Sequence, residues 1–297
     1  MINVGVLGLD TSHPASFAGL LEERSGTSLA AVWDGGDVRT TEYIDSFCNK
    51  HGAIQYDDPR AMVDTVDAVM ILTVNWDTHV SLAKLFLESN VPTLIDKPIV
   101  GNTSGVTALA DLAGPDAALF GGSAMPFHPA VDQLPRAVSN RTLFGAGYND
   151  YFYYRVHLTD TIRYIADADW VSVTPLEDPG STVRIRFENG THATLRFDGS
   201  ADDSAFGILD VANRTRTVEI PATEDALAEM YAPFVDAFLE VVAGDRDETE
   251  RLIDSARLIL GVESALDRAE PVTPDSRILT TVNQSGEAFL ADYEPYY

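Results

Sequence analysis

Short apolar runs alternate with helical patterns through the first 120 or so residues of the chain. The runs cover residues 2–9, 29–33, 66–74, 93–96 and 117–121. Between them apolar residues return at helical spacing, as Phe17, Leu20 and Leu21 do. Runs that are apolar throughout are typical of parallel strands buried on both faces. The alternation therefore predicts a doubly wound α/β domain of Rossmann type over residues 1–122.

Residues 123–297 show a different pattern of apolar and polar positions. Apolar and polar residues alternate over residues 183–187 and 193–197, and Asn189-Gly190 lies between the two runs. This pattern predicts an antiparallel hairpin with one buried face. Amphipathic helices are expected over residues 224–242 and 248–269. The second domain is thus expected to be α+β with an open, mainly antiparallel sheet, and its last helix is expected to pack back on the first domain.

Charge is the most unusual feature of the composition. The chain has 46 acidic and 20 basic residues, a net charge of −26, and only three lysines. Acidic residues spread over the whole chain indicate a solvated surface suited to a high-salt cytoplasm, where screening weakens self-repulsion. A basic stripe for nucleic acid is missing, and neither a membrane span nor a leader is expected. The single cysteine, Cys48, is interpreted as a packing residue.

Lys97 is the first candidate for chemistry. It directly follows an apolar run and precedes Pro98, which restricts the backbone around it. A buried ammonium at a strand end can donate a proton or hydrogen bond to a substrate hydroxyl. The alternative interpretation is a surface lysine that forms an ion pair with Asp96.

The first strand-turn-helix is where the pyrophosphate of a dinucleotide would lie. The expected pattern G-x-G-x-x-G is replaced here by Gly8-Leu9-Asp10-Thr11-Ser12-His13. An aspartate at the second glycine brings negative charge toward the phosphates. Asp34 ends the next strand and is placed to bind an adenosine ribose, which favours NAD over NADP. Asp10 and His13, with His128 or His157, also admit a metal site as a minor alternative.

Three further motifs are more specific in combination. They are Thr73-Val74-Asn75-Trp76-Asp77-Thr78-His79, Asp96-Lys97-Pro98 and His157-Leu158-Thr159-Asp160. Together they resemble the Gfo/Idh/MocA family of nicotinamide-dependent sugar and cyclitol oxidoreductases. The chain departs from the family pattern at Val74, which replaces a proline, and at Tyr153, which replaces the leading aspartate of the second-domain helix.

The resemblance implies a set of site residues. Lys97 and His157 would flank the reacting carbon, with His157 as general acid/base and Lys97 stabilising the oxyanion. Asp160 would bind sugar hydroxyls or orient His157, and Tyr153 would either replace the lost aspartate or serve in packing. The cofactor-binding residues implied are Gly8, Leu9, Asp10, Ser12, His13, Asp34, Thr73, Asn75, His79, Asp96 and Lys97. No resident metal is expected.

The function expected is hydride transfer between NAD and a hydroxyl carbon of a sugar, cyclitol or derivative. Arg155 and Arg163 are candidates for recognising an acidic substituent. A homodimer or homotetramer is expected to form through the open sheet, because an exposed apolar sheet face favours association. The altered glycine pattern leaves an alternative, a sugar-binding or regulatory protein that keeps the fold without catalysis.

Overall fold

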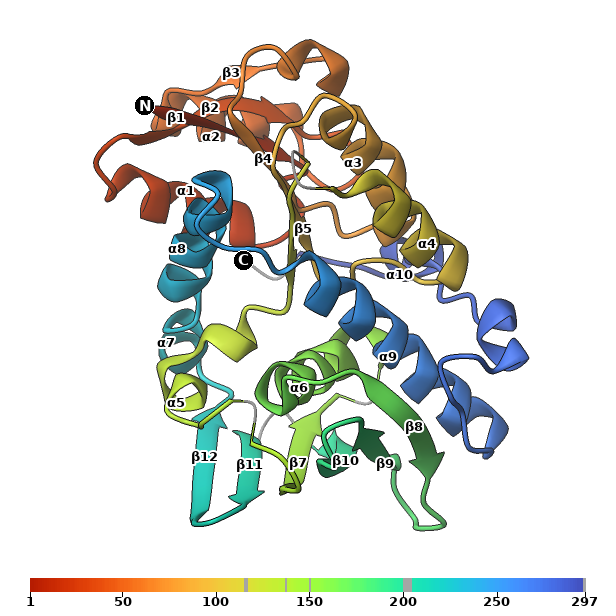
Figure 1. The fold of residues 1–297 in the computed structure, drawn as a ribbon. Helices are drawn as coiled ribbons and strands as arrows, with labels where there is room; N and C mark the ends of the chain where they lie inside the picture. The colour runs from red at the N-terminus through yellow and green to blue at the C-terminus, as the bar shows by residue number, and fades with distance from the viewer. Residues whose placement is uncertain (115–116, 137, 150, 200–204, 296–297) are drawn as a thin grey trace.

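The computed structural model describes residues 1–114, 117–136, 138–149, 151–199 and 205–295. Two six-stranded sheets lie at opposite ends of the molecule, and helices fill the space between them (Figure 1). The fold class predicted from the sequence is confirmed. The division at residues 122 and 123 is retained as a proposal, because helices from the second half also pack against the first sheet.

The first sheet is parallel throughout, in the order β3-β2-β1-β4-β5-β6. Its strands are β1 (Ile2–Leu7), β2 (Thr27–Trp33), β3 (Ile54–Gln55), β4 (Ala68–Ile71), β5 (Thr93–Asp96) and β6 (Leu119–Gly122). The connections contain α1 (His13–Glu22), α2 (Thr41–His51), η1 (Pro59–Met62), η2 (Trp76–Thr78), α3 (His79–Leu87) and α4 (Thr103–Leu112). Strand order reverses between β1 and β4, which is where open α/β sheets bind ligands.

The second sheet has the order β12-β11-β7-β10-β9-β8, and only the β7–β10 pair is parallel. Its strands are β7 (Thr142–Tyr148), β8 (Trp170–Pro175), β9 (Thr182–Phe187), β10 (His192–Gly199), β11 (Ala205–Val211) and β12 (Thr215–Pro221). The hairpin expected around Asn189-Gly190 joins β9 to β10, and Gly190 has a φ of 80°, a left-handed conformation that glycine adopts readily.

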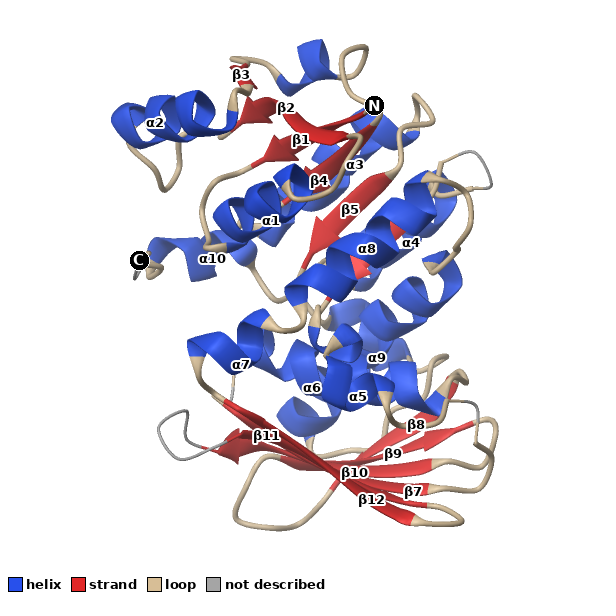
Figure 2. Cartoon of the chain, turned by 90° about the vertical axis from the view of Figure 1, so that its left-hand side faces the viewer, coloured by secondary structure: helices blue, strands red, loops and turns tan. Residues whose placement is uncertain are grey.

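Helices of the second half connect the two sheets. They are η3 (Met125–Phe127), α5 (Pro129–Asp132), α6 (Phe152–Ala166), α7 (Glu224–Ala228), α8 (Tyr231–Val242), α9 (Thr249–Arg268), η4 (Arg277–Thr281) and α10 (Gly286–Ala291). Helices α6 and α9 cover one face of the second sheet, and its other face is open (Figure 2). Helix α9 also contacts α4 and β6, and α8 contacts α1.

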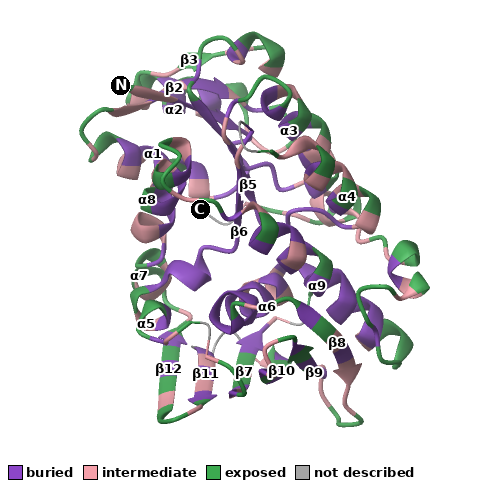
Figure 3. Ribbon diagram, in the orientation of Figure 1, coloured by how far each residue is buried: buried purple, intermediate pink, exposed green. Residues whose placement is uncertain are grey.

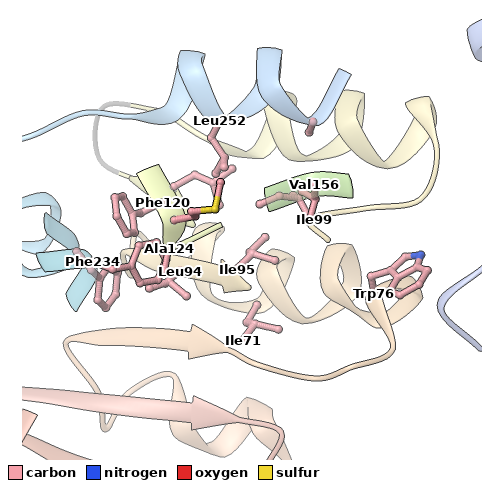
Figure 4. Close-up of a cluster of buried hydrophobic side chains, with 14 of the residues drawn as sticks. Ile71, Trp76, Leu94, Ile95, Ile99, Phe120, Ala124, Val156, Phe234 and Leu252 are labelled. Carbon is pink, nitrogen blue, oxygen red and sulfur yellow. The ribbon is translucent and has the colours of Figure 1, made fainter. Parts of the chain in front are cut away.

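A continuous core fixes the two halves against each other. Buried residues dominate the strands of the first sheet and the inner faces of α6 and α9 (Figure 3). Ile95 of β5, Phe120 of β6, Val156 of α6 and Leu252 of α9 belong to one cluster (Figure 4). This packing holds the carboxyl ends of the first sheet close to α6.

One local expectation was wrong. The single helix expected over residues 224–242 is divided into α7 and α8. Pro233 explains the break, because it has no N–H for an intrahelical bond and is tolerated only near the start of a helix. Asp58 caps the four-residue 3-10 helix η1 by accepting the Arg60 N–H. No helix in the described residues is long and apolar enough to cross a membrane.

Candidate active site

A small enclosed cavity lies where the first sheet meets α6. Its volume is about 100 Å³, and its lining combines residues from both halves of the chain. The lining residues are Thr11, Ser12, His13, Lys97, Met125, Tyr148, Tyr153, Tyr154, His157, Phe206, Leu227, Met230, Tyr231 and Tyr293. Lys97 and His157, predicted from the sequence to act together, therefore line one cavity.

Lys97 is buried at the end of β5. Its Nζ lies 3.0 Å from the centre of the Tyr153 ring and 5.6 Å from that of Tyr154. Burial lowers the pKa of Lys97 to about 7, against the opposing charge of Asp96. The ammonium can therefore gain and lose a proton near neutral pH, as a catalytic acid or base must.

His157 faces the cavity from α6. Its Nδ1 lies 2.8 Å from the Ser123 Oγ, at the end of β6. Burial, together with the charges of Lys97 and His13, holds the pKa of His157 well below its usual value. A neutral imidazole whose Nδ1 is bonded to Ser123 has its Nε2 left to exchange a proton with a ligand.

Asp160 does not line the cavity, which corrects the expectation that it binds sugar hydroxyls. One carboxylate oxygen accepts hydrogen bonds from Arg251 and from the Ser255 Oγ, both at 2.7 Å. The other accepts the Ser123 N–H at 2.9 Å. Asp160 therefore ties the Ser123 turn to α9, and it bears on His157 only through Ser123.

Tyr153 packs against aromatic neighbours. Its ring stacks on Phe289 of α10 at 4.6 Å between ring centres, and Trp76 lies 6.4 Å away. The opposite partner is the Lys97 ammonium, which makes a cation–π contact. Tyr153 thus positions Lys97 through its ring, which favours the packing interpretation of the two weighed from the sequence.

His13 and Asp96 form a pair that the sequence did not predict. The His13 Nδ1 lies 2.6 Å from one Asp96 carboxylate oxygen, and the other oxygen accepts the Lys97 N–H at 2.8 Å. Although burial raises the pKa of Asp96, the charge and hydrogen bond of His13 and the charge of Lys97 lower it overall. The strands β1 and β5 are not neighbours, so the pair bridges the end of β4.

The turn after β1 keeps two features of a nucleotide site. Gly8 has a φ of 89°, and a Cβ there would lie 2.7 Å from the Thr73 backbone nitrogen, so only glycine fits. Asp34 is buried at the end of β2 and accepts the N–H groups of Leu9 at 2.9 Å and Gly36 at 3.1 Å. The Leu9 N–H is therefore already bonded within the turn, and the Leu9 carbonyl accepts a bond from Arg39.

Asp10 occupies the place of the second glycine. Its carboxylate turns inward and accepts the Val74 N–H at 2.7 Å. Burial raises the pKa of Asp10 to about 7, opposed by that hydrogen bond. Asp10 is thus partly protonated at neutral pH, which weakens the repulsion that the sequence predicts for a pyrophosphate.

A buried histidine fixes the loop after β4. His79 is fully buried, and its ring nitrogens lie 2.9 Å from the carbonyl oxygens of Ile99 and Thr73. The expectation that His79 contacts a cofactor is thereby corrected, because the ring holds two loops together and has no surface to offer. Thr73 contacts Thr78 through its hydroxyl, and Asn75 caps η2 by accepting the Asp77 N–H.

The C-terminal segment closes over this edge of the sheet. The Trp76 indole donates to the Gln284 carbonyl at 2.7 Å, and the Tyr293 hydroxyl donates to the Asp10 carbonyl at 3.3 Å. Gly286 lies against η2 so closely that a Cβ would be 2.5 Å from the Asn75 Oδ1. The segment thus contacts both the β1 turn and the β4 loop.

Two other expectations from the sequence are corrected. Arg155 forms an ion pair with Glu263 at 2.7 Å, and Arg163 forms ion pairs with Asp169 and Asp254, so neither lines the cavity. The alternative metal site is not assembled, since among the described residues no three histidine, cysteine or acidic side chains gather to hold an ion.

A nicotinamide coenzyme fits the retained features of this edge. Gly8 provides the tight turn, α1 begins directly after it, Asp34 stands at the ribose position, and Asp10 is turned away with a raised pKa. Gly8, Ser12, Asp34 and Asn75 would hold the coenzyme.

Comparison with known proteins relates the first domain to a known family. Residues 2–118 match the sequence model described as "Oxidoreductase family, NAD-binding Rossmann fold", the GFO_IDH_MocA family. This match covers the Rossmann-type domain and agrees with the resemblance seen in the sequence. A search of curated proteins gave no significant match.

Solved structures share the fold over nearly the whole chain. A probable dehydrogenase from Thermotoga maritima has a TM-score of 0.75 at 17% identity and covers 92% of this chain and 99% of its own. The UDP-N-acetylglucosamine 3-dehydrogenase of Acidithiobacillus ferrooxidans has a TM-score of 0.70 at 20% identity, with 90% and 98% covered. The scyllo-inositol dehydrogenase of Lactobacillus casei has a TM-score of 0.71 at 14% identity, with 93% and 99% covered.

Several site residues escaped the sequence reasoning. They are Ser123, Arg251 and Ser255 around Asp160 and His157, and Tyr148, Tyr154, Tyr231 and Tyr293 in the cavity lining. Ser123 follows the last strand of the first sheet, and that position at a carboxyl end is the one signal that points to it. The tyrosines belong to no motif and reach the cavity only through tertiary packing.

Proposed function

We propose that the protein is a nicotinamide-dependent oxidoreductase that interconverts a hydroxyl carbon and a carbonyl in a sugar, cyclitol or derivative. The observation that carries the proposal is the meeting of Lys97 and His157 in one enclosed cavity beside the switch point of a Rossmann sheet. The pKa of Lys97, lowered to about 7, suits proton exchange near neutral pH, and the lowered pKa of His157 keeps its imidazole neutral and able to accept a proton.

A bound nicotinamide coenzyme would supply the hydride acceptor for the substrate carbon in the oxidative direction. His157, neutral and held by Ser123, takes the hydroxyl proton as the carbonyl forms. The Lys97 ammonium, fixed by the Tyr153 ring, donates a hydrogen bond to the same oxygen and stabilises the negative charge that develops on it. Asp160 and Ser123 act as positioning residues for His157.

Asp34 supports NAD as the coenzyme, because a buried carboxylate binds ribose hydroxyls and disfavours a 2′-phosphate. Reduction of NAD and of NADP should be followed by the absorbance of the reduced nicotinamide ring against a panel of polyols and hydroxy acids, at high salt. Turnover with NAD that is lost on His157→Asn supports the proposal. Binding of polyols without turnover, by folded protein, points to the non-catalytic alternative, which the engaged Leu9 N–H favours.

The assembly that we propose is a homodimer or homotetramer formed through the open face of the second sheet. Phe144 and Val211 are exposed there, and a hollow of about 490 Å³ lies over β7, β11 and β12. Light scattering at high salt should find more than one subunit, and Phe144→Asp should shift the protein to monomer. A cytoplasmic location in a high-salt cell is part of the same proposal, and unfolding on transfer to low salt would support it.

A further inference from the structure

The charge of the cavity lining is opposite to that of the protein as a whole. The chain contains 46 acidic residues, yet none of the fourteen residues that line the cavity is acidic. Three of them, His13, Lys97 and His157, carry basic nitrogens. The lining therefore offers basic nitrogens and hydroxyl groups but no carboxylate, an arrangement that suits an anionic group of a ligand.

The carboxylate of Asp96 lies next to these basic groups but does not line the cavity. Both oxygens of Asp96 are engaged, one with the His13 Nδ1 at 2.6 Å and one with the Lys97 N–H at 2.8 Å. The Nδ1 of His13 is directed at Asp96, so Nε2 is the ring nitrogen that remains for a ligand. The ring of His13 is held in place by Phe17 and Tyr231, each 5.3 Å away between ring centres.

The ammonium of Lys97 also lacks an anionic contact. Within the described residues, Nζ forms no ion pair or hydrogen bond, and its neighbour is the ring of Tyr153 at 3.0 Å. Burial lowers the pKa of this group to about 7, although the charge of Asp96 acts in the opposite direction. A bound anion would therefore be stabilised by the lysine and would in turn favour its protonated form.

The size of the cavity limits the ligand. A cavity of roughly 150 Å³ accommodates benzene, a molecule of six heavy atoms. The cavity here measures about 100 Å³, which favours a short acyclic molecule over a pyranose or cyclitol ring.

We propose that the substrate is a small hydroxy acid of three or four carbons, whose carboxylate is bound between His13 and Lys97 with its hydroxyl toward His157. His13 is then a specificity residue of this chain, on the loop where the glycine pattern is lost. The inference rests on the proposed function and narrows its substrate from a neutral polyol to an acid.

Lactate and lactamide provide a direct test, because they have the same number of heavy atoms and differ in charge. Each is titrated into wild-type protein by calorimetry, with and without saturating nicotinamide coenzyme. We expect lactate to bind and lactamide to bind at least tenfold more weakly. Since a hydrogen bond to a charged group contributes roughly 1.5–3 kcal/mol, His13→Asn and Lys97→Met should each weaken lactate binding roughly 10- to 100-fold.

His51 supplies the matched control. Its Nδ1 lies 2.6 Å from a Glu22 carboxylate oxygen, the same separation as in the His13–Asp96 pair, and neither His51 nor Glu22 lines the cavity. His51→Asn should leave lactate affinity unchanged, and circular dichroism should show that each variant is folded. Equal binding of lactate and lactamide, or no effect of His13→Asn, would overturn the inference.

The coenzyme titration separates this inference from the proposed function. Lactate binding by a protein that binds no nicotinamide coenzyme would support the anion site and reject the oxidoreductase. Turnover of neutral polyols with no preference for acids would support the oxidoreductase and reject the anion site.

Discussion

Replacing Asp10 by asparagine should stabilise the protein at alkaline pH and have little effect at acidic pH. Asp10 is 2% exposed, and burial raises its pKa from 3.8 to about 7. The folded state therefore binds more protons than the unfolded state between these two values, and the stability that this group contributes is lost as the pH rises toward 7. Asparagine carries no charge and can still accept the Val74 N–H.

The size of the stability gain in Asp10→Asn follows from the pKa shift of Asp10. A difference of about three pKa units at 1.36 kcal/mol per unit sets a ceiling of about 4 kcal/mol on the gain above pH 7. The gain should shrink progressively below pH 7 and vanish near pH 4. Urea unfolding followed by tryptophan fluorescence, at constant high salt and a series of pH values, measures it.

Asp57→Asn provides the control, because Asp57 is exposed and its replacement should change stability little at any pH. The reasoning would be refuted if Asp10→Asn were no more stable than wild type at pH 8, or if its gain did not depend on pH. The same variant should bind NAD more tightly at pH 8, since a buried negative charge in the turn after β1 is removed.

Three further predictions concern catalysis, core electrostatics and the C-terminal segment. Lys97→Met should lower kcat by roughly 10²–10³ without unfolding the protein, because the oxyanion loses its donor. In the wild type, kcat/KM should fall as the pH rises through the Lys97 pKa of about 7. Steady-state kinetics over a pH series tests both predictions, and unchanged turnover of the variant would exclude the assigned role. Arg251→Met leaves Asp160 buried without its cation and should lower the free energy of unfolding by about 3–5 kcal/mol. Urea unfolding should show that adding Asp160→Asn restores part of this loss. An Arg251→Met variant as stable as the wild type would contradict the prediction. Gly286→Ala should displace α10, because the added Cβ would lie 2.5 Å from the Asn75 Oδ1. The fluorescence of Trp76, whose indole donates to the Gln284 carbonyl, should then shift to the red. An unchanged spectrum would show that the segment accommodates the methyl group.

The sequence predicted what depends on local pattern. Apolar runs and helical periodicity were sufficient for the first sheet, and the alternation around Asn189-Gly190 was sufficient for a hairpin of the second. Lys97 was predicted at a carboxyl strand end, and the family resemblance brought His157 to the same site. Both residues line one cavity because their places follow from the order of elements.

What escaped prediction depends on contacts between distant residues. Asp160 matched a motif, yet its partner Arg251 lies 91 positions away, and that ion pair makes the carboxylate structural. His13 reaches Asp96 across the end of β4, which no spacing in the sequence reveals. The docking of Tyr293 and Gly286 on the first sheet likewise depends on how the final helices return to it.

The most direct test of the account is a fluorescence titration of purified protein with NADH and with NADPH at high salt. The account predicts saturable binding of NADH, with a dissociation constant in the micromolar range typical of enzyme ligands, and weaker binding of NADPH because Asp34 disfavours the 2′-phosphate. Asp34→Asn should reduce that preference. Folded protein that binds neither nucleotide would contradict the central claim that this cavity serves a nicotinamide-dependent reaction.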